Sequence, residues 1–174
     1  MLPAETILRR ATVEDAPKLA LLGAATFLVA FASDHPGDAL LDHCAGEHSA
    51  GRYSAWLTKP DYAFWLIETS LGAPIGYAML CPPELDITPE PNALELKRIY
   101  TLPGWQDAGL GRRLMNAAIE EARARGATTL YLCVYTVNVN AQRFYARFGF
   151  EQVGQQQFMT GSVPFTDWIL RKHL

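Results

Sequence analysis

Residues 106–113, with the sequence QDAGLGRR, lie between an apolar strand-like run and a helix-like run. Gly109 and Gly111 carry no Cβ, so the backbone there can approach a ligand closely. The helix behind them directs its first unpaired N–H groups and the positive end of its dipole toward the loop. Arg112 and Arg113 add two positive charges. This combination predicts a cradle for a pyrophosphate group.

The loop lacks the features of two common phosphate-binding motifs. It has no Gly-Lys-Ser/Thr ending, as a Walker loop has, and no G-x-G-x-x-G run with an acidic ribose partner. The pattern Q-x-x-G-x-G is weak by itself, because two glycines at a strand-to-helix turn also occur as plain turn chemistry. A protein that binds phosphate or a nucleotide in a different way therefore stays open at this point.

The histidines and cysteines offer no comparable site. Residues 42–48, DHCAGEH, contain two i, i+4 pairs of metal-ligand types, but the pairs lie on adjacent helix faces without the HExxH order. We expect a solvated helix face there and no metal. The three cysteines are odd in number and widely spaced, which excludes a disulfide framework or a zinc pair. Cys133 lies in an apolar run, where a small core residue is favoured over an acyl-enzyme nucleophile.

Strands and helices must position the loop, and hydrophobic periodicity and turn residues predict them. We expect strands at 6–10, 63–69, 75–81, 94–102, 128–135, 150–158 and 166–172, and helices after Thr12 and at 38–57, 110–125 and 138–148. The order is β-α-α-β-β-β-α-β-α-β-β. Hairpins together with helical crossovers imply one mixed sheet with helices on its faces. We therefore expect an α/β fold, built on an α+β type of mixed sheet. A single domain should span residues 1–174.

Cap and turn residues mark the ends of several of these elements. Gly126 is expected just past the end of the helix at 110–125, where a left-handed residue often closes a helix. Asn138 can cap the next helix, and Gly149 can end it. Residues 161–164, GSVP, predict the turn between the last two strands.

The composition indicates a globular protein with one domain, because 174 residues with 49% hydrophobic and 19% charged side chains can form a good core. A net charge of −3 argues against nucleic acid and is compatible with a cationic ligand. The first residues show no secretory signal, and the longest apolar stretch, 19–32, is too short to span a bilayer. We therefore expect a cytoplasmic monomer or homodimer that binds neither nucleic acid nor membrane.

A second motif lies downstream of the Gly loop. Residues 138–150, NVNAQRFYARFGF, show the pattern N-x-x-A-x-x-F-Y-x-x-x-G-F. Together with the loop, this pattern resembles the GNAT superfamily of acetyl-CoA-dependent N-acetyltransferases. The resemblance covers nearly the whole chain through the element order and is sharpest over 94–150. Within the superfamily the chain looks most like bacterial spermidine/spermine N-acetyltransferases, in residues 94–100 and 158–161 and at Asp167.

The resemblance implies that acetyl-CoA is the co-substrate and that no metal takes part. The pyrophosphate is expected on the loop N–H groups, and the pantetheine arm along the strand before the loop. The implied cofactor-binding residues are Ile99, Tyr100, Thr101, Leu102, Gln106, Asp107, Ala108, Gly109, Leu110, Gly111, Arg112, Asn138, Ala141 and Tyr145. The chain departs from the family pattern at Asp107 and Ala108, where Arg/Gly and Lys/Arg are common. An acid at 107 is expected to weaken cofactor affinity modestly.

Two residues are implied as catalysts. A free amine has a pKa near ~10, so a base must take a proton before attack. Glu95 lies eleven residues before Gln106, the spacing at which many GNAT enzymes place a catalytic glutamate. The alternative for Glu95 is an exposed carboxylate paired with Lys97 or Arg98. Tyr145 occupies the family's general-acid position, from which a phenol protonates the leaving thiolate; the alternative is a core tyrosine.

We therefore expect an N-acetyltransferase that moves an acetyl group from acetyl-CoA to a primary amine, with a polyamine such as spermidine as the first candidate. The alternatives are acetylation of a protein N-terminus, an amino acid or an antibiotic amine, and a non-catalytic acyl-CoA-binding module. Phe27 and Phe31 are expected in the core, in helices that commonly border the acceptor site in this family. Seven acidic residues could attract a polyamine but are more often plain surface charges: Asp34, Asp38, Asp42, Glu47, Glu84, Asp86 and Glu90.

Overall fold

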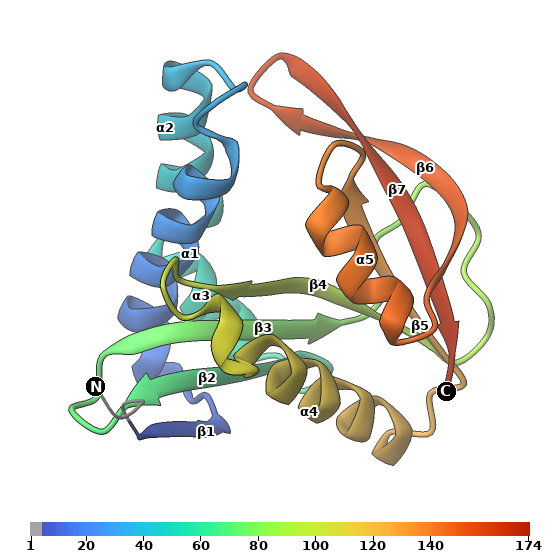
Figure 1. Ribbon diagram of the computed structural model, residues 1–174, viewed down its shortest axis with the longest axis horizontal. Helices are drawn as coiled ribbons and strands as arrows, with labels where there is room; N and C mark the ends of the chain where they lie inside the picture. Colours follow the sequence, from blue (N-terminus) through green and yellow to red (C-terminus); the bar gives the residue numbers. More distant parts are fainter. Residues whose placement is uncertain (1–4) are drawn as a thin grey trace.

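A mixed sheet of seven strands forms the centre of the computed structural model, which describes residues 5–174 apart from the side chain of Asp107 (Figure 1). The elements are β1 (Thr6–Arg10), η1 (Val13–Asp15), α1 (Ala16–Phe31), α2 (Gly37–Glu47), α3 (Ala50–Leu57), β2 (Ala63–Thr69), β3 (Pro74–Cys81), β4 (Ala93–Thr101), η2 (Gln106–Ala108), α4 (Leu110–Ala124), β5 (Thr129–Tyr135), α5 (Val139–Arg147), β6 (Glu151–Thr160) and β7 (Val163–His173). The predicted α/β class with a mixed sheet is confirmed.

The sheet changes direction at its middle. Its strand order is β1-β2-β3-β4-β5-β7-β6, and every neighbouring pair is antiparallel except β4 and β5. These two strands are parallel, and they pair only over Ala93–Glu95 and Thr129–Tyr131. Beyond Glu95 the two strands diverge, which leaves their facing edges available to a ligand.

A bulge in β4 lies where the strands diverge. Met79 of β3 pairs with Arg98, but the next residue of β3 pairs with Leu96. Lys97 is therefore an extra residue, and such a bulge bends and twists its strand. The bulge also puts Glu95 and Arg98 on one face, because their partners on β3 are two residues apart.

Helices cover both faces of the sheet (Figure 1). α4 packs on β2, β3 and β4, and α1 packs on the other face of β3 and β4 with α3 beside it. The apolar stripe of α4 has helical spacing: Leu110, Leu114, Met115, Ala118, Ile119 and Ala122. Tyr145 and Phe150 belong to the same core as this stripe, which places α5 on the α4 side. Within residues 5–174, no helix combines the length and the apolar composition needed to cross a membrane.

The predicted caps are present. The side chain of Asn138 accepts a hydrogen bond from the N–H of Ala141 at 3.1 Å, which starts α5. Gly126 and Gly149 follow α4 and α5 with φ values of 77° and 81°. This left-handed conformation is open to glycine and disfavoured for other residues, so both glycines end their helices.

Two predicted boundaries are wrong. The single helix expected at 38–57 is two helices, because the hydroxyl of Ser49 accepts a hydrogen bond from the N–H of Arg52 at 3.2 Å and starts α3 as a new helix. The last two strands are longer than expected, since β6 and β7 pair up to their shared turn. Only residues 161 and 162 of the predicted turn at 161–164 lie outside the strands.

Candidate active site

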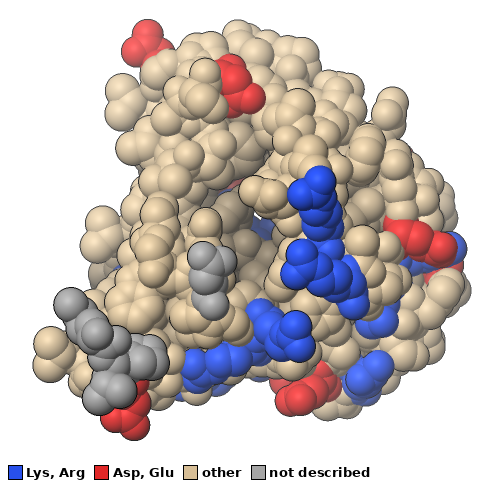
Figure 2. All heavy atoms as spheres, in the orientation of Figure 1, with Lys and Arg blue, Asp and Glu red and all other residues tan. Residues whose placement is uncertain are grey.

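A cleft of about 1510 Å³ opens where β4 and β5 diverge. Figure 2 shows a hollow near the centre of this face of the molecule. Its lining comes from α1, α2 and α3, from β4 and β5, from η2 and the first turn of α4, and from α5, β6 and β7. The predicted site residues that line the cleft are Glu95, Ile99, Tyr100, Thr101, Gln106, Gly111, Asn138, Ala141 and Tyr145. Those outside its lining are Leu102, Ala108, Gly109, Leu110 and Arg112, and the side chain of Asp107 is outside the described residues.

The Gly loop presents backbone N–H groups at the edge of this cleft. Gly109 is the residue before α4 and has a φ of 71°, a conformation that glycine adopts at no steric cost. The N–H of Arg113 donates to the carbonyl of Gly109 at 3.2 Å. The N–H groups of residues 109–112 therefore precede the first turn of hydrogen bonds and have no acceptor within the helix. With the helix dipole, they form an end that favours an anion.

Two groups of the loop region have partners within the protein. The N–H of Ala108 donates to the carbonyl of Trp105 at 3.4 Å. The guanidinium of Arg113 donates to the hydroxyl of Thr6 at 2.6 Å and to its carbonyl at 3.3 Å. These neutral partners leave the positive charge of Arg113 in place near the start of α4, so its contribution to the cradle stays a prediction. The same hydrogen bonds attach β1 to α4.

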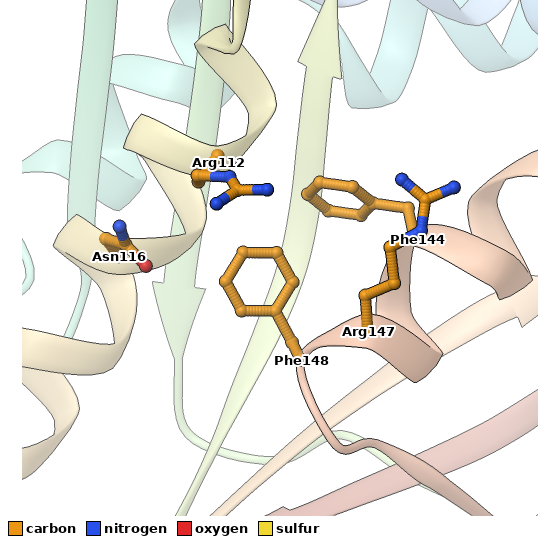
Figure 3. Close-up of a pocket in the computed structure, with 5 residues that line it drawn as sticks. All are labelled: Arg112, Asn116, Phe144, Arg147 and Phe148. Atoms are coloured by element: carbon orange, nitrogen blue, oxygen red, sulfur yellow. The ribbon is translucent and has the colours of Figure 1, made fainter.

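A second pocket, of about 160 Å³, lies between α4 and α5 (Figure 3). Arg112 and Asn116 of α4 line it with Phe144 and Arg147 of α5 and with Phe148, which follows that helix. In Figure 3 the guanidinium of Arg112 points toward the space between the helices and the two phenyl rings. Figure 2 shows Lys and Arg side chains gathered along the neighbouring rim of the hollow. These charges make the outer end of the cleft attractive to anions.

One edge of β4 faces the cleft with free backbone groups. The N–H of Leu102 donates to the carbonyl of Ile75 of β3 at 2.9 Å. Successive residues of a strand direct their N–H and C=O groups to alternate edges. Tyr100 therefore also faces β3, whereas Ile99 and Thr101 present their backbone groups to the cleft. An extended ligand with amides can pair with these two residues as an added strand would.

α5 places Tyr145 in the wall of the cleft. The residue is 8% exposed, and its ring packs against Phe144 and Phe150 with centroid distances of 5.5 Å and 6.1 Å. Burial raises the pKa of its hydroxyl above the ordinary value, and Tyr100 and Cys133 add to this effect. The phenol is therefore protonated at neutral pH and has a proton to donate.

Glu95 is buried at the point where β4 and β5 part. It is 3% exposed, and its carboxylate accepts the backbone N–H of Glu84 at 2.7 Å. Burial raises the pKa of Glu95, and the charge of Lys97 and this hydrogen bond oppose the rise. The alternative of an exposed ion pair is wrong, because Lys97 pairs with Glu84 and Arg98 pairs with Glu47. The carboxylate lines the cleft, and among residues 5–174 as described no cationic side chain pairs with it.

Arg98 is a cleft residue for which the sequence indicated no role beyond an ion pair. Its guanidinium donates to the hydroxyl of Tyr53 at 3.1 Å and lies 4.8 Å from the ring centroid of Trp56. It also lies 3.6 Å from the carboxylate of Glu47. These contacts with α2 and α3 fix a positive charge in the wall. The bulge at Lys97 puts Arg98 on the same face of β4 as Glu95. A regular alternation of side chains along the strand would have predicted the opposite face for Arg98.

Four further residues line the cleft against or beyond expectation. Cys133 is half-buried in the cleft wall, so the expectation of a core position is wrong. Burial raises the pKa of its thiol, which makes it a poor nucleophile. Phe27 is buried and Phe31 half-buried, and both line the cleft. Asp167 of β7 also lines it, and burial raises the pKa of this carboxyl to about 6.

The predicted solvated face at residues 42–48 is only partly correct. His48 is 4% exposed, and its ring nitrogen lies 3.0 Å from the hydroxyl of Tyr53. Burial lowers the pKa of His48 to about 3, so the ring is neutral at physiological pH. In the part of the chain that the structure describes, no group of three or more His, Cys, Asp or Glu residues is placed to hold a metal ion.

The cleft combines a helix end that favours anions, a free strand edge, a protonated phenol and a buried carboxylate. A ligand with a diphosphate at one end and amides along its length matches the first two features. A reacting group between Tyr145 and Glu95 would meet a proton donor on one side and a proton acceptor on the other.

Comparisons with known proteins agree with this chemistry. Residues 25–150 match the family described as the Acetyltransferase (GNAT) family. An uncharacterised N-acetyltransferase of Mycobacterium tuberculosis is 31% identical over 160 residues, which are 92% of this chain and 98% of that protein. The spermine/spermidine N(1)-acetyltransferase of Bacillus subtilis is 32% identical over 86 residues, which are 48% of this chain and 57% of that protein.

A solved structure shares the whole fold. The PaiA N-acetyltransferase of Thermoplasma acidophilum, in complex with coenzyme A, has a TM-score of 0.79 at 20% identity, over 98% of this chain and 99% of that chain. This likeness supports the fold alone, whereas the family match and the mycobacterial relative extend over most of the sequence. The chain therefore belongs to the GNAT acetyltransferase family, and it is an acyltransferase.

Proposed function

We propose that the protein transfers an acetyl group from acetyl-CoA to a primary amine bound in the cleft. One observation carries the proposal: the amino end of α4, the free edge of β4, Tyr145 and Glu95 border a single cavity. Acetyl transfer needs an anchor for the co-substrate, a proton acceptor for the amine and a proton donor for the thiolate. The cleft supplies all of these within one continuous space.

Acetyl-CoA fits the cleft from its outer end inward. Its diphosphate suits the N–H groups of residues 109–112, and its pantetheine amides suit the backbone groups of Ile99 and Thr101. Asn138 and Ala141, at the start of α5, border the same path. The Thermoplasma relative was solved with coenzyme A, which supports this assignment for a chain of the same fold.

The reaction is direct attack of the amine on the thioester. An amine with a pKa near ~10 binds as an ammonium ion, and Glu95 is the proposed acceptor of its proton, directly or through water. The neutral nitrogen then attacks the acetyl carbon, so that a C–N bond forms and the C–S bond breaks. The leaving thiolate takes the proton of Tyr145, and the resulting tyrosinate recovers one from the nitrogen of the new amide.

A polyamine is the proposed acceptor. The Bacillus relative is named as a spermine/spermidine acetyltransferase, although it aligns with about half of this chain. The acidic residues of the cleft lining are Asp34, Glu47, Glu84, Glu95 and Asp167. Those that lack a cationic partner among the described residues suit a cationic acceptor. A protein N-terminus, an amino acid or an antibiotic amine is the alternative acceptor.

The test is release of the coenzyme A thiol from acetyl-CoA in the presence of separate amines. The panel holds spermidine, free amino acids, a peptide with a free N-terminus and an aminoglycoside. We expect release that depends on the amine, together with a product heavier by one acetyl group. If coenzyme A raises the unfolding temperature but no amine causes thiol release, the protein binds acyl-CoA without this activity.

A further inference from the structure

Most acidic side chains that line the cleft already have partners within the protein. Glu47 lies 3.6 Å from Arg98, and Glu84 pairs with Lys97. In each pair the opposite charges largely cancel at the surface of the cleft. These carboxylates are therefore poor binding groups for an incoming cation.

Asp167 differs from the others. Asp34 accepts a hydrogen bond from the hydroxyl of Tyr135 at 2.9 Å, and Glu95 accepts one from the backbone N–H of Glu84 at 2.7 Å. Within the described residues, the carboxylate of Asp167 has neither a hydrogen-bond donor nor a cation at bonding distance. A charge that is largely removed from water without a partner is costly, and a ligand that brings the partner recovers that cost.

The register of the sheet places Asp167 in the same half of the cleft as Glu95. Tyr131, Cys133 and Tyr135 alternate onto one face of β5. Glu95 of β4 pairs with the first of these residues, and Asp167 of β7 pairs with the last. The two carboxylates thus lie on the same face, on opposite sides of β5 and four residues apart along it.

Asp167 also lies close to the place of acyl transfer. Burial raises the pKa of Tyr100 and of Cys133, and the negative charge of Asp167 adds to both increases. The same two residues add to the raised pKa of Tyr145. Tyr100 and Cys133 therefore lie near both the proposed general acid and the unpaired carboxylate, and all four residues line the same cleft.

Two aromatic rings accompany this carboxylate. Tyr135 is its partner across β5 and β7, and Phe165 is two residues before it on the same face of β7. Their ring centroids are 5.8 Å apart, and both residues line the cleft. Aromatic rings attract ammonium groups as well as the methylene groups between them.

We propose that Asp167 binds a second ammonium group of the acceptor, and that the acceptor is accordingly a diamine or polyamine. This inference rests on the proposed function. The attacking nitrogen must lose a proton, for which Glu95 is assigned. A second nitrogen with a pKa near ~10 keeps its charge and needs a counter-ion within the cleft. Asp167 is the carboxylate that is available for it.

The experiment compares α,ω-diamines, from propane to hexane, with alkylamines in which a methyl group replaces the second nitrogen. Wild-type kcat/KM should favour the diamine, chiefly through a lower KM. Asp167→Asn should reduce this preference by about tenfold, the usual value of one charged hydrogen bond. Asp167→Glu should retain part of it. Asp61→Asn, which removes an exposed charge outside the cleft lining, should leave the preference unchanged.

The pH dependence of the wild-type preference gives a second readout that needs no variant. Asp167, with a pKa of about 6, is ionised at neutral pH and becomes protonated below it. The preference for diamines should therefore fall as the pH drops through this value. Burial keeps the neighbouring Tyr100, Cys133 and Tyr135 neutral over this range. Other ionisable groups on this side are Asp34, which accepts a hydrogen bond from Tyr135, and His35, which stacks on Phe165. Protonation of Glu95 affects both acceptors alike and cancels in the ratio.

The outcomes separate this inference from the function on which it rests. Acetylation without a preference for diamines, or a preference that persists in Asp167→Asn, overturns the role of Asp167 and leaves acetyl transfer intact. If Asp167→Asn does not fold, a wild-type preference that is constant across acid pH overturns it equally. Thiol release with none of these amines or those of the wider panel rejects the proposed function and this inference with it.

Discussion

Burial sets the protonation of both proposed catalytic side chains, in directions that suit opposite tasks. It disfavours the charged form of each group, so Tyr145 keeps its proton and Glu95 binds one more readily than an exposed glutamate does. Tyr145 is thus protonated and able to donate to the thiolate, and Glu95 has a raised affinity for the proton of the amine. Each role can be removed by a substitution that keeps the shape of the side chain.

Tyr145→Phe should lower kcat by about 100-fold, which is the lower range for loss of a general acid. The phenyl ring keeps the packing against Phe144 and Phe150, so the unfolding temperature and the KM for acetyl-CoA should change little. Steady-state kinetics of thiol release measure the effect. The control is Tyr131→Phe, which removes a hydroxyl that accepts the N–H of Glu90 away from the cleft. Equal activity of wild type and Tyr145→Phe would remove Tyr145 from the mechanism.

Glu95→Gln should slow the reaction most at the low end of the pH range. There the amine is almost entirely protonated, and attack depends on a base. The deficit should shrink as the pH approaches the pKa of the amine near ~10, because free amine then forms without help. A profile of kcat/KM against pH measures this. Glu84→Gln, which changes a carboxylate paired with Lys97 in the cleft wall, is the matched control. Parallel profiles for wild type and Glu95→Gln would contradict the role.

The turn into α4 depends on backbone conformation rather than on side chains. Gly109→Ala would force a Cβ into a residue with a φ of 71°, at a cost of about 1–2 kcal/mol, and would disturb the N–H groups that follow. We expect a lower unfolding temperature and weaker binding of coenzyme A in calorimetric titration. Gly104→Ala carries the same kind of strain at a φ of 84° but lies before the cradle. Gly104→Ala should lower the unfolding temperature by a similar amount and leave the affinity for coenzyme A near that of the wild type. Equal losses of affinity in the two variants would show that instability, and not the cradle, weakens binding.

Helices and strands with a clear hydrophobic periodicity or a clear cap residue could be predicted from the sequence. Breaks and bulges within them were harder to predict. The strand, Gly loop and helix around residues 106–113 follow from periodicity and glycine placement, as does the cap at Asn138. The break at Ser49 was missed because one hydroxyl decides it within a continuous helical pattern. Lys97 interrupts the alternation of β4, so the face of Arg98 could not be read from the sequence.

Long-range partners explain the remaining errors about the site. The contact of Arg113 with Thr6 was missed because nothing local shows that the two residues lie side by side. The burial of Glu95 depends on a backbone N–H that the loop after β3 supplies. The position of Asp167 in the cleft could not be predicted from the sequence, because it depends on β7 lying next to β5 in the sheet. Such contacts between distant segments arise from the topology and not from local pattern.

Stability of the whole molecule depends on a charged cluster far from the cleft. Arg9 of β1 donates two hydrogen bonds to Asp15, at 2.7 Å and 2.8 Å, and one to Glu68 of β2 at 2.7 Å. The hydrogen bond from Arg9 lowers the pKa of Asp15 to about 2, although burial opposes the change. Asp15 and Glu68 are 5% and 6% exposed, so they depend on this partner.

Arg9→Ala should lower the free energy of unfolding by about 3 kcal/mol, because it leaves two buried carboxylates with fewer partners. In the wild type the contribution of Asp15 is present above its ordinary pKa of 3.8 and is lost as the pH falls toward 2. The variant should lack that part of the acid dependence. Urea unfolding at several pH values measures both effects. Arg10→Ala breaks a partly exposed pair with Glu121 and a contact with the ring of Trp65, and it should cost about 1–2 kcal/mol, less than Arg9→Ala. Similar losses for both variants would contradict the assignment.

A crystal structure of the protein with coenzyme A would decide whether the cleft is used as proposed. We predict that the diphosphate oxygens lie within about 3.2 Å of backbone nitrogens in residues 109–112, with the pantetheine amides against Ile99 and Thr101 and the sulfur next to Tyr145. A diphosphate bound away from the start of α4, or a thiol outside the cleft between β4 and β5, would contradict the proposed mechanism.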